Sequence, residues 1–167
     1  MARAVIFVVV MVVVVILGRV GVANAWTPFG VPFDHTSITY SCGSSTLQVA
    51  VQSWTEVSAL TDGGCSEEPD IQFVVLSPWP YSNDILGVAG GRTIWVREDT
   101  KNHLGVVTHE VGHVLGLGHS NDANANMYWL CCNPISSDDI AGVVALYGPP
   151  EEPWYKYRVI ALGVSAD

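Results

Sequence analysis

The stretch His109-Glu110-Val111-Gly112-His113-Val114-Leu115-Gly116-Leu117-Gly118-His119 decides the fold, because it specifies a helix and the turn that ends it. It fits the pattern HExxHxxGxxH at every fixed position, a match that chance would produce with a probability of roughly one in 10⁵. Residues four apart share one face of a helix, so His109 and His113 can direct their imidazoles at one point. Gly116 can adopt a positive φ and turn the chain, which returns His119 to the same point.

The residue types in this stretch predict a catalytic zinc site. Three neutral imidazole nitrogens leave one coordination position open, as in catalytic rather than structural zinc sites. We therefore expect His109, His113 and His119 to bind zinc, and Glu110 to act as the general base on the zinc-activated water that hydrolyses a peptide bond. Two other interpretations stay open: a helix with surface histidines, and an exported zinc-binding or interaction module without turnover.

Three segments of the chain have the apolar spacing of helices. The first begins at Ser44, and the last begins at Ser136, where Asp139 completes a capping box. The middle helix covers residues 103–115, with Asn102 as its cap, and carries the first two histidines. Four apolar residues of this middle helix are expected to face the interior: Leu104, Val107, Val111 and Leu115.

Strands are predicted between these helices, where apolar residues alternate or form short runs. They cover residues 36–42, 71–76, 85–89 and 93–96. Residues 61–64, Thr-Asp-Gly-Gly, are interpreted as a loop that follows the first helix, so the first two strands and that helix form a βαβ unit. The prediction is an α+β fold with a twisted mixed sheet of four to five strands and three main helices.

The first 25 residues have the features of a secretory signal peptide. Arg3 precedes an apolar run over residues 4–17, and Ala23-Asn24-Ala25 forms a small-x-small cleavage site. A membrane anchor is the alternative, but this run of 14 residues is shorter than the roughly 20 that span a bilayer. We expect a signal peptide at 1–25, a catalytic domain at 26–148, a linker and tail at 149–167, and a secreted protein.

Composition and charge exclude several classes of protein. The chain of 167 residues is 49% hydrophobic and 14% charged, which excludes a disordered protein. Seven basic residues against 16 acidic ones give a net charge of −9 without a basic cluster, so nucleic acid is not an expected partner. The expected partner is a protein or peptide substrate, bound by a monomer that has no stable association with membranes.

Four cysteines in an exported chain predict disulfide bonds. They are Cys42, Cys65, Cys131 and Cys132. Four thiols allow three pairings, and the sequence does not choose among them. A zinc-binding role is disfavoured, because no two of these cysteines have CxxC spacing.

On these residues, the chain resembles the metzincin metalloendopeptidases and, among them, the matrixins. Ser120 follows the third histidine, and Met127 stands where this family has the methionine of its Met-turn. These two positions favour the matrixins over another metzincin subgroup. Further similar segments, within a resemblance that covers about residues 26–148, are Trp54-Thr55-Glu56-Val57, Asp70-Ile71, Leu86-Gly87-Val88-Ala89 and residues 138–148.

The resemblance implies a zincin-like catalytic domain with one catalytic zinc ion. It also implies that the substrate lies extended along an edge strand at residues 86–89 and that a hydrophobic specificity pocket lies behind the zinc. Where this family has histidines for a second zinc, only His103 is present, so that site is expected to be missing. Trp129 replaces a family proline, so the residue preference does not carry over. Three scattered acids leave calcium undecided: Asp84, Asp99 and Asp122.

Overall fold

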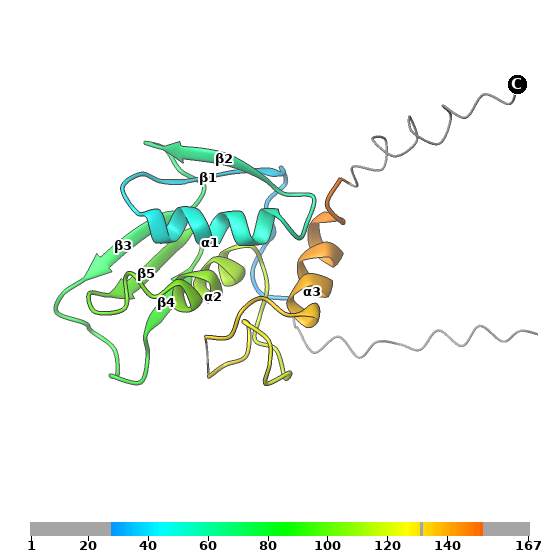
Figure 1. The fold of residues 1–167 in the computed structure, drawn as a ribbon. Coiled ribbons are helices and arrows are strands. Elements are labelled where there is room, and N and C mark those ends of the chain that lie inside the picture. The colour runs from blue at the N-terminus through cyan, green and yellow to red at the C-terminus, as the bar shows by residue number, and fades with distance from the viewer. Residues whose placement is uncertain (1–27, 131, 152–167) are drawn as a thin grey trace, which may run out of the picture.

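The structure, a computed structural model, describes residues 28–130 and 132–151. The expected signal peptide at residues 1–25 lies outside these ranges, and so does the expected tail from residue 152 onward. Within the described ranges, no helix combines the length and the apolar character needed to cross a bilayer. The described chain has three helices and five strands, arranged as Figure 1 shows.

A helix that connects two parallel strands forms the first part of the fold. Strand β1 (Ser37–Ser41) leads into α1 (Ser45–Thr55), and β2 (Thr61–Ser66) returns parallel to β1. Ser44 caps α1 as predicted, since its side chain accepts a hydrogen bond from the backbone nitrogen of Leu47 at 3.2 Å. The buried face of α1 consists of Leu47, Ala50, Val51 and Trp54.

The predicted loop at residues 61–64 is wrong, because these residues begin strand β2. The register between β1 and β2 shifts between Ile38 and Thr39, which leaves Gly63 as the extra residue of a bulge. A Cβ on Gly63 would lie 3.0 Å from the backbone carbon and oxygen of Ile38. The glycine therefore permits two strands to approach closely, a use of glycine that the sequence does not distinguish from a turn.

The second sheet lies beside the first and has the order β3-β5-β4. It contains β3 (Gln72–Leu76), β4 (Gly87–Gly90) and β5 (Thr93–Arg97). Strand β5 lies in the middle, parallel to β3 and antiparallel to β4, so β4 is one of the two edge strands of this sheet. A single parallel bridge from Tyr40 to Ile71 connects β1 with the start of the second sheet. The predicted mixed sheet of four to five strands is confirmed, with its strands divided between two sheets.

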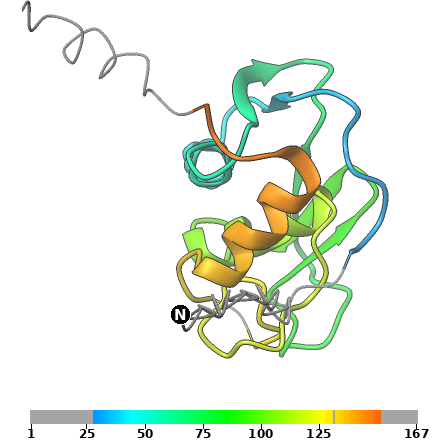
Figure 2. The ribbon, with the colours of Figure 1, turned by 90° about the vertical axis from the view of Figure 1, so that its right-hand side faces the viewer.

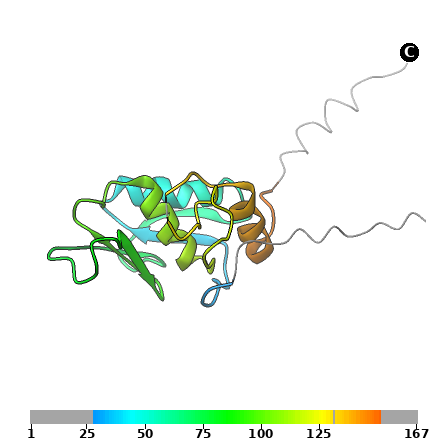
Figure 3. The same ribbon diagram turned by 90° about the horizontal axis from the view of Figure 1, so that it is seen from below.

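Helix α2 (Leu104–Val114) packs against α1, β4 and β5, and Figure 3 shows α1 and α2 on the same side of the strands. The cap of α2 is His103 and not the predicted Asn102, since the His103 side chain accepts from the backbone nitrogen of Val106 at 3.4 Å. Leu104 is 43% exposed, contrary to expectation, and lines a surface cavity at the first turn of the helix. The other three predicted core residues of this helix are buried: Val107, Val111 and Leu115.

Helix α3 (Ser137–Tyr147) lies at the end of the molecule where α1 and α2 terminate (Figures 1 and 2). The predicted capping box between Ser136 and Asp139 is confirmed. The hydroxyl of Tyr147 donates a hydrogen bond to the backbone carbonyl of Leu115 at 2.7 Å. This bond ties the last turn of α3 to the end of α2.

Disulfide bonds form as predicted, and the structure selects a pairing. Cys42, directly after β1, is bonded to Cys65 in β2. Cys132 is also disulfide-bonded, while Cys131 lies outside the described residues. The Cys42–Cys65 bond joins the carboxyl ends of two parallel strands.

Candidate active site

Three histidines converge at the end of α2. His109 and His113 lie one turn apart in the helix, and Gly116, with a φ of 102°, turns the chain so that His119 faces them. One ligand atom from each histidine lies within 4.8 Å of the others. The structure therefore brings together the three residues that the sequence predicts as metal ligands.

Backbone carbonyls orient two of these imidazoles. His109 donates from Nδ1 to the carbonyl oxygen of Asn126 at 2.7 Å, and His113 donates from Nδ1 to the carbonyl oxygen of Leu117 at 2.8 Å. A carbonyl oxygen only accepts, so Nδ1 carries the hydrogen in both rings and Nε2 keeps its lone pair. This is how carbonyl partners hold metal-binding histidines in the correct tautomer.

Desolvation favours the neutral form of the three imidazoles, of which His109 is buried, His113 partly buried and His119 exposed. It lowers the pKa of His109 and of His119, and it lowers the pKa of His113 to about 4, with a further contribution from the neighbouring His109. Neutral imidazole is the form that binds metal. Three nitrogen donors with no carboxylate among them match the ligand set of a catalytic zinc ion, so these residues fit zinc.

Glu110 lies next to the first histidine and is 6% exposed. Its carboxyl group rests against the edge strand: a Cβ on Gly87 would lie 2.8 Å from Oε1 of Glu110. Burial raises the pKa of Glu110 to about 8. The structure thus places the predicted general base next to His109 in α2 and against Gly87 of β4.

These groups line a cleft of about 730 Å³. One wall is the segment that leads into β4, including Ile85 and Leu86. Helix α2 contributes Val106, His109, Glu110 and His113, and His119 follows the helix. Trp129 and Leu130, from the turn after Met127, line the cleft too and are 61% and 60% exposed. Apart from the three histidines, Glu110 and Asp84, the lining is therefore largely apolar.

Met127 is fully buried beneath the helix that carries the histidines. A Cβ on Gly112 would overlap Sδ of Met127 and lie 2.9 Å from a ring carbon of Trp54. The carbonyl oxygen of Met127 accepts a hydrogen bond from the backbone nitrogen of Ser120 at 2.8 Å. The methionine therefore supports α2 from below and stays clear of the cleft.

Two residues that support the site were not identified from the sequence. Asn126 orients His109 through its carbonyl, and the carboxylate of Asp139 accepts hydrogen bonds from the backbone nitrogens of Asn126 (2.7 Å) and Met127 (2.9 Å). Both Asn126 and Asp139 have no exposed surface. Asp139 was predicted only as part of a capping box, because that local pattern accounts for an acid at this position.

Other polar residues noted in the sequence have local roles in the structure. His103 caps α2, Asp99 forms an ion pair with Arg97, and Asp122 accepts from the backbone nitrogen of Asn124 at 2.9 Å. Among the described residues, the three histidines are the one group of three potential ligands close enough to share a metal ion.

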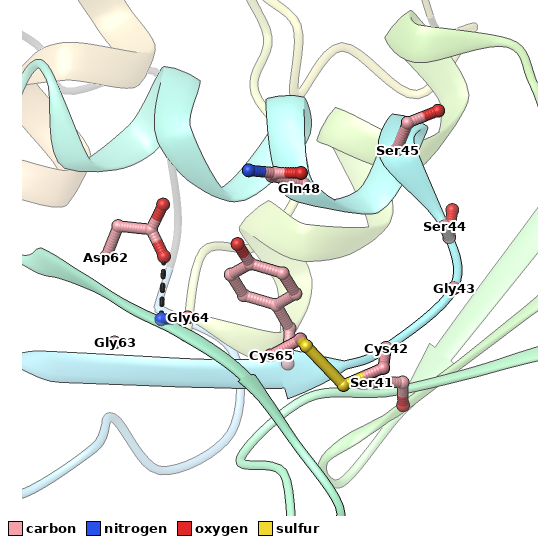
Figure 4. Close-up of a pocket in the computed structure, with 11 residues that line it drawn as sticks. Ser41, Cys42, Gly43, Ser44, Ser45, Gln48, Asp62, Gly63, Gly64 and Cys65 are labelled. Atoms are coloured by element: carbon pink, nitrogen blue, oxygen red, sulfur yellow. Dashed lines mark hydrogen bonds between the residues drawn. A yellow bond between two sulfur atoms is a disulfide. The ribbon is translucent and has the colours of Figure 1, made fainter.

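A second hollow, of about 620 Å³, lies beside the Cys42–Cys65 disulfide (Figure 4). It is lined by the end of β1, the start of α1 and residues of β2. There the Asp62 carboxylate accepts from the backbone nitrogen of Gly64 at 2.8 Å. No residue predicted for the active site lines this hollow, so the cleft at the histidines is the candidate site.

Comparisons with known proteins agree with this geometry. Among similar proteins, interstitial collagenase of Sus scrofa is 31% identical over 164 residues, which cover 76% of this chain and 35% of the collagenase. Matrilysin of Homo sapiens is 49% identical over 53 residues, 28% of this chain and 20% of that protein. Metalloendoproteinase 1-MMP of Arabidopsis thaliana is 50% identical over 50 residues, 26% of this chain and 14% of that protein.

The chain thus spans about a third of the length of the collagenase that it matches. The model of the matrixin peptidase family matches residues 35–148, from the segment before β1 to the end of α3. The chain therefore belongs to the matrixin family of zinc metalloendopeptidases.

Proposed function

We propose that this protein is a secreted zinc-dependent endopeptidase. The observation that carries the proposal is the convergence of three neutral imidazoles with a buried carboxyl group in one cleft. His109, His113 and His119 are the proposed zinc ligands, and Glu110 is the proposed catalytic base. Zinc would supply a Lewis acid for the substrate carbonyl and lower the pKa of a water molecule.

Glu110 moves the proton in the proposed reaction. Burial alone favours the protonated form of Glu110, whereas a zinc cation at the histidines would favour the carboxylate. In that ionised form Glu110 takes a proton from the water that attacks the carbonyl carbon of the scissile peptide bond. It returns this proton to the amide nitrogen as the carbon–nitrogen bond breaks, so the products are a carboxylic acid and an amine, and the acid then gives its proton to the amine or to water. Glu110 lies beside His109 in α2 and against Gly87 in β4. This position supports the role, because in the proposal the substrate lies between α2 and β4.

The substrate is proposed to bind as an extended strand on the free edge of β4. Within the described sheet, β4 has a strand neighbour, β5, on one side only. Backbone groups of an extended peptide can pair with such an edge, while pockets select its side chains. The edge strand and Glu110 touch at Gly87, so a peptide held there has its backbone beside the proposed base.

Secretion is part of the proposal. It is supported by the N-terminal pattern of Arg3, an apolar core and Ala23-Asn24-Ala25. The disulfide between Cys42 and Cys65 is also expected in an oxidising compartment. N-terminal sequencing of the exported protein tests this part, and the expected first residue is Trp26.

The activity is tested with the full chain, exported from a eukaryotic host, and a peptide library. We expect internal cleavage that stops when a chelator removes zinc and returns when zinc is added back. Retention of zinc without cleavage of any peptide would instead support an exported zinc-binding module. Cleavage that persists in the metal-free protein would contradict the assignment of His109, His113 and His119.

A further inference from the structure

The segment before β4 forms part of the cleft, although it belongs to neither a helix nor a strand. Asp84, Ile85 and Leu86 line the cleft, and Gly87 is the first residue of β4. Leu86 packs partly against the core, whereas Ile85 is 39% exposed. Burial alone therefore does not fix this segment, and hydrogen bonds from the chain at the end of β5 add to it.

Arg97, the last residue of β5, holds one end of the segment. Its guanidinium donates from Nη1 to the backbone carbonyl of Asn83 at 2.7 Å. The same group donates from Nε to the carboxylate of Asp99, and the Arg97 side chain is only 21% exposed. A planar guanidinium with several fixed donors can make both bonds at once. Asp99 thus orients the group that holds Asn83.

Thr100, three residues further along the chain, holds the other end. Its hydroxyl donates to the backbone carbonyl of Leu86 at 2.8 Å, and the backbone nitrogen of Arg97 donates to the same carbonyl at 3.4 Å. Thr100 is 8% exposed, and its own carbonyl accepts from the backbone nitrogen of His103, the cap of α2, at 2.8 Å. Thr100 therefore connects the segment before β4 to the start of the helix that carries the histidines.

The direction of the Leu86 carbonyl determines how β4 begins. In an antiparallel pair, the backbone groups of successive residues face the partner strand and the opposite edge in turn. The Leu86 carbonyl faces β5, so the backbone N–H and C=O of Gly87 face the free edge of β4. This is the edge on which the substrate is proposed to pair, and Gly87 is also the residue that rests against Glu110.

We propose that Arg97 and Thr100 are positioning residues for substrate binding, because they hold residues 83–86 so that β4 presents its free edge to the peptide. The inference rests on the proposed endopeptidase function. Neither side chain lines the cleft, so both act through the backbone carbonyls of Asn83 and Leu86. Loss of either bond loosens the edge that binds the peptide before and during the reaction. Such a loss raises KM and leaves kcat unchanged.

The first test compares Thr100→Val with Thr100→Ser in the full chain. Valine has nearly the shape of threonine but lacks the hydroxyl, whereas serine keeps it. With a library peptide that the unsubstituted protein cleaves, we expect Thr100→Val to raise KM about 2- to 10-fold at unchanged kcat and zinc content. Thr100→Ser should keep KM near normal. A lower kcat at unchanged KM in Thr100→Val, the result of a smaller folded fraction, would overturn the inference, and so would an equal rise of KM in Thr100→Ser.

The second test is Arg97→Gln, with Lys101→Gln as the matched control. Lys101 forms an ion pair with Glu98 in the same part of the chain, and removing its charge leaves the bond to Asn83 in place. We expect Arg97→Gln to raise KM about 2- to 10-fold and to speed amide hydrogen exchange over residues 83–87, with both unchanged in Lys101→Gln. An unchanged KM in Arg97→Gln, or an equal rise in Lys101→Gln, would overturn the inference and leave the endopeptidase function intact. Absence of all cleavage by the unsubstituted protein would overturn both.

Discussion

His109 donates a hydrogen bond from Nδ1 to the backbone carbonyl of Asn126 at 2.7 Å, across 17 residues of sequence. This bond links the helix that carries the histidines to the turn that contains Met127. The same turn is held from the other side by the carboxylate of Asp139 at the start of α3. The orientation of one proposed ligand thus depends on three segments that are separate in the sequence.

The variant Glu110→Gln tests the proposed base. It preserves the size of the side chain and removes its capacity to accept a proton, so we predict unchanged zinc content and a fall in kcat/KM of about 10²- to 10⁴-fold. Metal analysis and a peptide assay measure the two quantities. Glu56→Gln, at an exposed position after α1, is the control. Near-normal turnover by Glu110→Gln would remove Glu110 from the mechanism.

Zinc is predicted to stabilise the folded chain through the histidine group. A ligand that binds only the folded state adds about 4 kcal/mol at a free concentration of 1,000 times Kd. We therefore expect a chelator to lower the Tm and added zinc to restore it, and His119→Ala to lose most of this difference. His35→Ala should retain the difference, since His35 lies outside the group. A zinc-independent Tm in the unsubstituted protein would argue against the site.

Asp139→Asn is predicted to destabilise the fold and to disturb the site. The Asp139 carboxylate accepts hydrogen bonds from the backbone nitrogens of Asn126, Met127 and Ser136, and an amide can accept at only one of its two positions. Leaving buried donors without an acceptor costs about 1–3 kcal/mol. Chemical denaturation measures this loss, with the exposed Glu67→Gln as the control. Equal stability of Asp139→Asn would show that the turn holds without these bonds.

The pH dependence of stability is predicted to include a contribution from Asp70. Burial by itself raises its pKa, but hydrogen bonds from the backbone and hydroxyl of Thr39, and then from His35, hold the pKa below the ordinary value of 3.8. A lowered folded-state pKa stabilises the protein above that ordinary value, and this stability is lost as the pH falls through the folded pKa. We expect Asp70→Asn to flatten the acid limb of a plot of Tm against pH. An unchanged acid limb would contradict the role of Asp70.

His35 is predicted to act in the opposite direction. Hydrogen bonds to Asp34 and then to Asp70 raise its pKa above the ordinary value of 6.5. Its contribution is therefore present below that value and is lost as the pH rises through the folded-state pKa. The NMR titration of the His35 ring measures this pKa directly, and in Asp70→Asn it should move down toward 6.5. A midpoint at or below that value in the unsubstituted protein would exclude the predicted effect.

Much of the candidate site could be predicted because its patterns are local. The spacing of His109 and His113 on a helix, the turn at Gly116 and the capping box at Ser136 each depend on neighbouring residues, and the structure contains all three. The prediction of a loop at residues 61–64 was wrong because the structure there depends on a residue that is distant in the sequence. Gly63 serves a contact with Ile38, which lies on another strand and leaves no mark in the local pattern.

The sequence alone thus determined the histidine stretch, its helix and the turn that returns the third imidazole, because helical periodicity and glycine dihedral preferences act over a few residues. The tertiary structure alone decided that Asn126 and Asp139 orient the site and that Arg97 and Thr100 hold the segment before β4. Hydrogen bonds and close packing between distant segments have no periodic signature in the chain. They arise only when the sheet and helices bring those segments into contact.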